Sequence, residues 1–190
     1  MPTGTNPITR ATEYRGELGE FLSKYHYQPD LTQRLDKIRS TPLSQHLINE
    51  IVLWKANRYV AMSDDLLQSL DGVSNLKTGE HRQAESLLKQ LLSTHGVDVP
   101  LASTMLRFRN PQVFQIIDRH AYRAIYGERY ALHTTTPVMR KVTVYFNYLD
   151  ELYKLCGARG IVFETVDRLL YVFDKQKNGP LTARSNRGGA

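Results

Sequence analysis

The chain has 190 residues, 41% of them hydrophobic and 23% charged, which is enough for one domain with an apolar core. Its formal net charge of +6 at pH 7 favours a polyanionic partner, with nucleic acid the first candidate. The single cysteine, Cys156, excludes an internal disulfide and a four-cysteine iron–sulfur cluster. No apolar run reaches the roughly 18 residues of a membrane span, and residues 1–30 hold no signal-peptide core. We therefore expect a cytoplasmic protein with no membrane partner.

Apolar residues recur at helical spacing through almost the whole chain, and alternating strand-like runs are nearly absent. This pattern predicts an all-α fold, a bundle of about nine or ten helices. The predicted helices are, in chain order, 9–26, 31–39, 42–59, 63–72, 79–94, 100–108, 118–126, 138–155 and 162–175.

Turn and capping residues set the predicted ends of these helices. Asp30 and Ser63 are predicted N-caps, whereas Gly96, Gly127 and Gly157 are predicted to end the helices before them. Residues 1–177 are expected to form a single domain. Residues 178–190 are rich in Gly, Ser and Arg and have nothing to bury, so they are predicted to be a disordered basic tail.

The strongest functional pattern runs from His95 to Gly127. Gly96-Val97-Asp98 lies between two short amphipathic helices and predicts a hairpin, whose backbone N–H groups can hold a phosphate without reading sequence. Further on, Ile116-Ile117 leads into Asp118. An aspartate at the end of an apolar run costs free energy unless it is paired, caps a helix or is catalytic.

This stretch resembles the helix-hairpin-helix (HhH-GPD) DNA glycosylase superfamily, as a small member without an iron–sulfur cluster. In that superfamily a Gly–apolar–Gly hairpin precedes a helix with a small residue, here Ala102, and the catalytic aspartate follows. Gly96 and Asp118 are 118 − 96 = 22 positions apart, the register of the adenine-DNA glycosylases. The resemblance covers residues 47–127.

The resemblance implies a DNA-repair hydrolase that binds double-stranded DNA and excises a modified or mismatched base. It implies a monovalent cation, K⁺ or Na⁺, on the hairpin carbonyls and no required cofactor. A nucleoid-associated location in the cytoplasm and a monomeric state follow as expectations. The residues expected to hold the DNA backbone at the hairpin are Gly96, Val97, Asp98, Val99 and Pro100.

Asp118 has two interpretations. Hydrolysis of an N-glycosidic bond builds positive charge on the sugar, and a nearby carboxylate stabilises that charge or orients the attacking water. The alternative is that Asp118 only caps the helix that follows it, which stabilises by about 1 kcal/mol.

The helix over residues 42–59 supplies the other candidates. Glu50 matches the position of the general acid of adenine-DNA glycosylases; alternatively, it lies on a solvated face. Trp54-Lys55 replaces the usual glutamine pair. Trp54 is a candidate for stacking a flipped base, with core packing as the alternative. Lys55 is a candidate catalytic residue or a phosphate contact, together with Arg58.

Arg119 and Arg123 are four residues apart on one helix, so they share a face that either tracks phosphates or is simply solvated. His95 and His120 lack a third ligand at helical spacing, so no metal site is expected.

Two substitutions depart from the superfamily pattern. Asp98 replaces the second hairpin glycine, and its carboxylate would repel a phosphate. Pro100 stands where bifunctional members carry the Schiff-base lysine, so a monofunctional glycosylase is expected. A non-catalytic DNA-binding protein and a helical protein-interaction module remain as alternatives.

Overall fold

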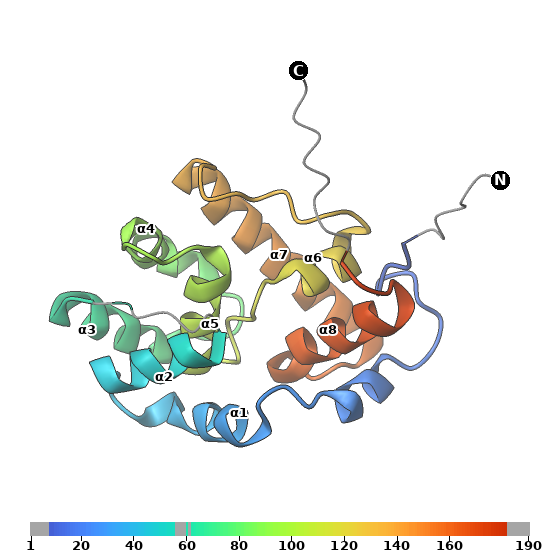
Figure 1. Ribbon diagram of the computed structural model, residues 1–190, viewed down its shortest axis with the longest axis horizontal. Coiled ribbons are helices and arrows are strands. Elements are labelled where there is room, and N and C mark those ends of the chain that lie inside the picture. Colours follow the sequence, from blue (N-terminus) through green and yellow to red (C-terminus); the bar gives the residue numbers. More distant parts are fainter. Residues whose placement is uncertain (1–7, 56–59, 61, 182–190) are drawn as a thin grey trace.

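The computed structural model describes residues 8–55, 60 and 62–181 and is all-helical over these residues, without a strand (Figure 1). The predicted all-α fold is confirmed. The α-helices are α1 (Pro29–Asp36), α2 (Gln45–Lys55), α3 (Asp64–Gly72), α4 (Glu85–Ser93), α5 (Val99–Arg109), α6 (Arg119–Tyr126), α7 (Val138–Arg159) and α8 (Val166–Lys177). Short 3₁₀ segments are η1 (Leu18–Lys24), η2 (Ile38–Ser40), η3 (Val73–Asn75), η4 (His81–Ala84) and η5 (Phe163–Thr165).

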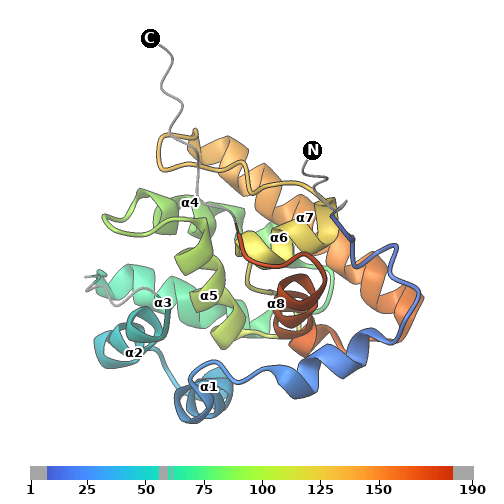
Figure 2. The same cartoon turned by 45° about the vertical axis from the view of Figure 1, so that its right-hand side comes forward.

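The helices form two groups that share one connected apolar core. In the first, α5 is the central helix and packs against α2, α3 and α4. In the second, α8 packs against α6 and against η1. The long helix α7 contacts α4 as well as α6 and so joins the groups (Figures 1 and 2).

The N-terminal segment differs from the prediction of a single helix over residues 9–26. It holds a turn, an irregular stretch and only the 3₁₀ helix η1. Glycine is a poor helix former, and at Gly16 an added Cβ would lie only 2.6 Å from the Tyr14 ring. The apolar residues Leu18 and Phe21 are nevertheless buried, so their spacing reflects packing and not an α-helix.

Two predicted helix ends are confirmed and three are wrong. Ser63 caps α3, and Gly127 ends α6 with φ +70°, a left-handed conformation that favours glycine. Gly96, at φ +82°, lies in the turn after α4 but does not cap it, because α4 ends at Ser93 and its C-cap is Thr94. Asp30 lies inside α1, which begins at Pro29. Gly157 lies inside α7, because Gly160 is the residue that adopts the left-handed conformation (φ +63°).

Asn178 ties the two ends of the described chain together. Its side-chain oxygen accepts a hydrogen bond from the Thr9 N–H at 2.5 Å, and its amide donates to the Thr9 carbonyl at 2.8 Å. The ordered fold therefore extends past residue 177, where the predicted tail was expected to begin. Residues 182–190 of that tail lie outside the described residues.

Candidate functional site

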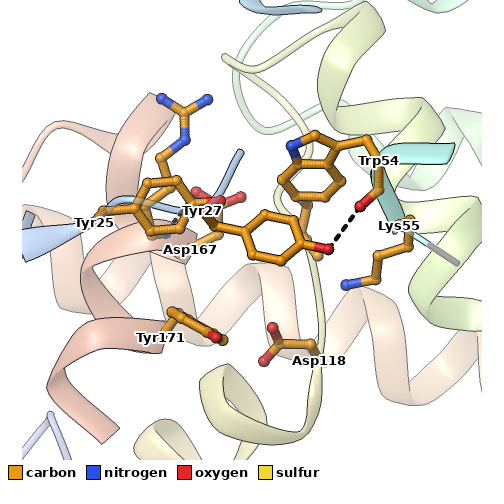
Figure 3. Close-up of a pocket in the computed structure, with 9 residues that line it drawn as sticks. Tyr25, Tyr27, Trp54, Lys55, Asp118, Asp167 and Tyr171 are labelled. Carbon is orange, nitrogen blue, oxygen red and sulfur yellow. Dashed lines mark hydrogen bonds between the residues drawn. The ribbon is translucent and has the colours of Figure 1, made fainter. Parts of the chain in front are cut away.

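A pocket of about 160 Å³ opens where the end of α2, the approach to α6 and the start of α8 meet the segment after η1 (Figure 3). We call it the central pocket. It is lined by Tyr25, Tyr27, Trp54, Lys55, Ile116, Asp118, Asp167, Arg168 and Tyr171. Three residues predicted from the sequence are therefore brought together, Trp54 and Lys55 from the end of α2 and Asp118 from the N-cap of α6.

Asp118 is both a helix cap and a pocket residue. Its Oδ1 accepts hydrogen bonds from the backbone N–H groups of His120 at 2.9 Å and Ala121 at 2.8 Å, which caps α6. The predicted capping role is confirmed. Oδ2 takes no part in these bonds, so one carboxylate oxygen remains for the pocket. The N-terminus of α6 favours a negative charge at this place through its dipole.

Lys55 is the last residue of α2, and its amine points into the same space as the Asp118 carboxylate (Figure 3). The amine lies 5.9 Å from the Trp54 ring. Within the described residues no carboxylate lies within salt-bridge distance of it. The end of α2 is held in place by Tyr27, whose hydroxyl donates a 2.8 Å hydrogen bond to the Trp54 carbonyl.

Trp54 is only 4% exposed, and its ring packs edge-on against Tyr27 and Phe108. Its indole N–H donates to the Thr32 hydroxyl at 2.8 Å, which satisfies the polar atom of a buried tryptophan. Core packing is thus confirmed for Trp54, and the residue also lines the pocket. These contacts fix the ring as a rigid wall.

Glu50 does not line the central pocket. Its side chain is buried, so the alternative of a solvated face is wrong. Its Oε1 forms an ion pair with the Arg34 guanidinium at 2.8 Å and lies 3.2 Å from His46 Nε2. The structure therefore does not bring Glu50 together with Asp118.

Three tyrosines of the pocket, Tyr25, Tyr27 and Tyr171, were missed by sequence reasoning. Tyr25 and Tyr171 meet edge to face, with ring centroids 6.1 Å apart. Burial raises the pKa of Tyr25 well above its ordinary value, so this hydroxyl stays protonated and can donate a hydrogen bond. Together with Trp54, the tyrosines give the pocket flat apolar faces that suit a planar ring.

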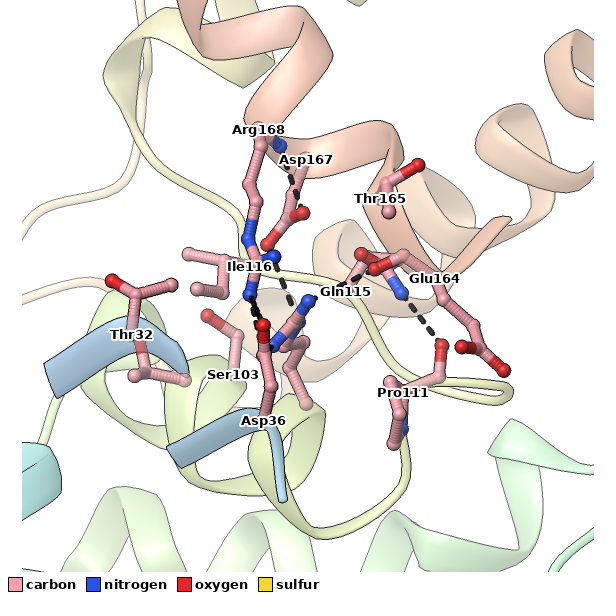
Figure 4. Close-up of polar contacts among 12 residues, drawn as sticks. Thr32, Asp36, Ser103, Pro111, Gln115, Ile116, Glu164, Thr165, Asp167 and Arg168 are labelled. Atoms are coloured by element: carbon pink, nitrogen blue, oxygen red, sulfur yellow. Dashed lines mark hydrogen bonds and ion pairs between the residues drawn. The ribbon is translucent and has the colours of Figure 1, made fainter. Parts of the chain in front are cut away.

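The start of α8 supplies a charged wall, shown with its surroundings in Figure 4. Asp36 of α1 is ion-paired to both Arg168 and Arg107. Burial alone would raise the pKa of Asp36, but the two guanidinium groups hold it below its ordinary value. Arg107 is 3% exposed and also donates to the Glu164 carbonyl at 2.9 Å, so it braces α5 against η5. Asp167 lies beside this cluster, 3.7 Å from Arg107 Nε.

A second hollow of about 560 Å³ adjoins the central pocket and shares Lys55 with it; we call it the hairpin groove. It is lined by Lys55, Gly96, Asp98, Pro100, Leu101, Arg119, Tyr130, Leu132, His133 and Thr134. The predicted hairpin is the turn between α4 and α5, closed by a hydrogen bond from Val97 N to Thr94 O. Val97 and Val99 have buried side chains, so only their backbone can face a ligand.

Asp98 is accommodated without a second glycine. It adopts an extended conformation (φ −126°) and caps α5 through a 2.8 Å hydrogen bond from the Val99 N–H to Oδ1. Lys141, whose side chain is buried, places its Nζ 2.9 Å from the same oxygen. The expected repulsion between Asp98 and a phosphate is therefore offset by a fixed positive charge.

The two arginines of α6 have different surroundings. Arg119 is exposed and lines the hairpin groove. Arg123 is 7% exposed, binds the fully buried Asp174 through Nε and NH2, and donates to the Gly179 carbonyl at 2.7 Å. The prediction that Arg123 holds a phosphate is wrong, because its guanidinium is used inside the fold. Arg58 lies outside the described residues.

Within residues 8–55, 60 and 62–181, no group of three His, Cys, Asp or Glu side chains is placed to hold a metal ion. Over the same residues, no helix combines the length and apolar character needed to cross a membrane. Comparison with known proteins finds no match for this chain among family models, curated proteins or solved structures.

Proposed function

We propose that the protein is a monofunctional DNA glycosylase that excises a base from double-stranded DNA. One observation carries the proposal. The Asp118 carboxylate, the Lys55 amine and four aromatic rings share one pocket, and through Lys55 that pocket adjoins the hairpin groove. A nucleotide turned out of the duplex needs this combination of a backbone-binding edge, flat walls for the base and a charged group at the sugar.

The hairpin groove would hold the DNA backbone. The backbone N–H groups of Gly96 and Asp98 have no hydrogen-bond partner among the described residues, and Arg119 adds a positive charge beside them. Donors of this kind bind phosphate without reading sequence. The backbone carbonyls of Gly96 and Val97 accept no hydrogen bond within the described chain, so they fit the predicted monovalent cation, which stays a prediction.

The chemistry would take place at Asp118. As the bond from sugar to base breaks, Oδ2, which accepts no hydrogen bond from the described residues, would stabilise the positive charge on the sugar or orient the attacking water. The leaving base needs a proton donor. Glu50 lies outside the pocket, so we assign this role to Lys55, whose amine points into the pocket that would hold the base.

The first experiment is strand scission by hot alkali on a panel of duplexes that each carry one modified or mismatched base. Wild type is compared with Asp118→Asn and with Asp65→Asn, a control at an exposed carboxylate in the first turn of α3. We expect scission at one lesion with wild type and the control but not with Asp118→Asn. Equal scission by wild type and Asp118→Asn would contradict the assignment of Asp118.

Lys55 also offers an amine for covalent chemistry, which a monofunctional enzyme does not use. Borohydride treatment during turnover separates the two possibilities, because it traps a Schiff base as a stable protein–DNA complex. We expect no trapped complex with wild type. A complex that disappears in Lys55→Gln would show a bifunctional enzyme with Lys55 as the nucleophile.

A non-catalytic DNA-binding protein is the second candidate, since helix capping by itself accounts for an aspartate at position 118. It predicts salt-dependent binding of DNA by wild type and by Asp118→Asn, with no base released from any duplex. A protein-interaction module predicts no such salt dependence.

A further inference from the structure

A third hollow, of about 410 Å³, adjoins the central pocket on the side of η1 and α8. It is lined by Lys24, His26, Tyr27, Tyr171, Val172, Lys175 and Gln176, and we call it the Lys24–Lys175 groove. Tyr27 and Tyr171 line both this groove and the central pocket, just as Lys55 lines both the central pocket and the hairpin groove. The central pocket therefore adjoins two grooves, and the residues that it shares with one groove differ from those that it shares with the other.

The two lysines of this groove are exposed and carry unneutralised charge. Lys24 Nζ donates to the Gln176 side-chain oxygen at 3.2 Å, which links η1 to α8. Lys175 Nζ lies 5.0 Å from the centre of the Tyr171 ring and 3.4 Å from its hydroxyl. Neither amine has a carboxylate within salt-bridge distance in the described part of the chain.

This arrangement contrasts with that of two arginines in the same helix group. Arg123 and Arg168 are both paired with aspartates inside the fold. Lys24 and Lys175 instead leave their charge at a concave surface next to aromatic rings. An unpaired pair of amines in a groove attracts a polyanion and releases counterions from it on binding.

We propose that the Lys24–Lys175 groove binds the phosphodiester backbone of the strand whose nucleotide enters the central pocket. The hairpin groove holds that strand on one side of the flipped nucleotide, and the Lys24–Lys175 groove holds it on the other. Tyr27 and Tyr171 then separate the bound base from the flanking phosphates. This inference rests on the proposed DNA substrate but not on base excision itself.

Binding is measured on a duplex with a central tetrahydrofuran residue, a stable abasic analogue that needs no knowledge of the lesion. The double variant Lys24→Gln/Lys175→Gln is compared with Lys77→Gln/Lys154→Gln, which removes the same two charges at exposed sites elsewhere. Each phosphate contact adds about 0.9 to the slope of log K against log salt. We expect the slope to fall by about 2 in the first variant and to stay unchanged in the control.

A second arm locates the contacts. Neutral methylphosphonates replace the phosphates on the 5′ or the 3′ side of the abasic residue in otherwise identical duplexes. The affinity of Arg119→Gln for DNA is expected not to change when the phosphates on one side of the abasic residue are replaced. The affinity of Lys24→Gln/Lys175→Gln is expected not to change when the phosphates on the other side are replaced. Lys24→Arg/Lys175→Arg, which keeps both charges, should behave as wild type.

Equal salt slopes for the groove variant and its control would overturn the inference. So would insensitivity of the groove variant and Arg119→Gln on the same side of the abasic residue. The excision assay is a separate readout of the proposed function. Binding that follows these expectations without release of any base would support the groove and contradict only the glycosylase.

Discussion

Substitutions at Asp118 separate its role as a helix cap from the chemical role that we propose for it. In Asp118→Asn the amide oxygen can still accept from the N–H groups of His120 and Ala121, and asparagine ranks with aspartate as a helix N-cap. The lost charge at the N-terminus of α6 costs about 0.3–1 kcal/mol of stability. Asp118→Ala loses the cap as well, about 1 kcal/mol more. For a protein of this size, 1 kcal/mol lowers the Tm by about 2–4 °C.

We therefore expect Asp118→Asn to unfold within about 4 °C of wild type, and Asp118→Ala several degrees below Asp118→Asn. Both variants should lose base excision by a factor on the order of 10³, because both lack the carboxylate beside the sugar. The measurements are thermal unfolding by circular dichroism and single-turnover excision on the lesion found with the duplex panel. An excision rate of Asp118→Asn equal to that of wild type would refute the chemical role, and helix capping would then be the only role of Asp118. A Tm loss in Asp118→Asn as large as in Asp118→Ala would show that the amide does not keep the cap.

Three further predictions concern stability and charge. Burial lowers the pKa of His81, so below about pH 6.5 the unfolded chain binds a proton that the folded chain does not, and the free energy of unfolding falls. The difference between the urea midpoints at pH 7 and pH 5 should therefore be smaller in His81→Leu than in wild type. An unchanged difference would contradict this role of His81. Arg123→Met leaves Asp174 buried without its main partner and should lower the free energy of unfolding, measured in urea, by about 3–5 kcal/mol. A loss below about 1 kcal/mol would show that the ion pair does not stabilise the fold. Lys141→Met removes the charge that offsets Asp98 and should weaken DNA binding about fivefold in a filter-binding assay. Adding Asp98→Asn to the same chain should restore the affinity. A double variant that binds as weakly as Lys141→Met would show that the loss does not come from the uncompensated Asp98 charge.

Local signals in the sequence predicted much of the fold. Ser63 and Gly127 each act through a contact or conformation within a few residues, so their neighbours suffice to place them. Gly157 shows the limit of such signals. A glycine costs stability inside a helix but does not by itself end one, and in α7 it is Gly160, not Gly157, that adopts the left-handed φ at the helix end. The α-helix predicted over residues 9–26 was wrong for another reason. The spacing of Leu18 and Phe21 reflects their packing against α8 and not an α-helical hydrogen-bond pattern within the segment.

The site was predictable only in part. Asp118 was found because an aspartate after an apolar run is unusual and because it lies 22 positions after the hairpin glycine Gly96. Lys55 was found because Trp54-Lys55 stands where the superfamily that the stretch resembles has a glutamine pair. Tyr25 and Tyr171 carried no such signal, since aromatic residues at helical spacing normally indicate core. The burial of Arg123 was also invisible, because it depends on Asp174, 51 residues further along the chain. Pairings of that range come from tertiary packing, and no local pattern encodes them.

The packing of η1 on α8, closed by the bonds between Thr9 and Asn178, has a consequence for the order in which the molecule assembles. These contacts join residues 169 positions apart, so they belong to the slowest class of folding event. During synthesis the first group of helices can collapse while α8 is still inside the ribosome. Tyr25 and Tyr27 follow η1, and Tyr171 lies on α8, so the walls of the central pocket meet only after both segments have emerged. Until then the nascent chain has the hairpin but lacks the complete central pocket, so the hairpin groove and the pocket come together only at the last step of assembly.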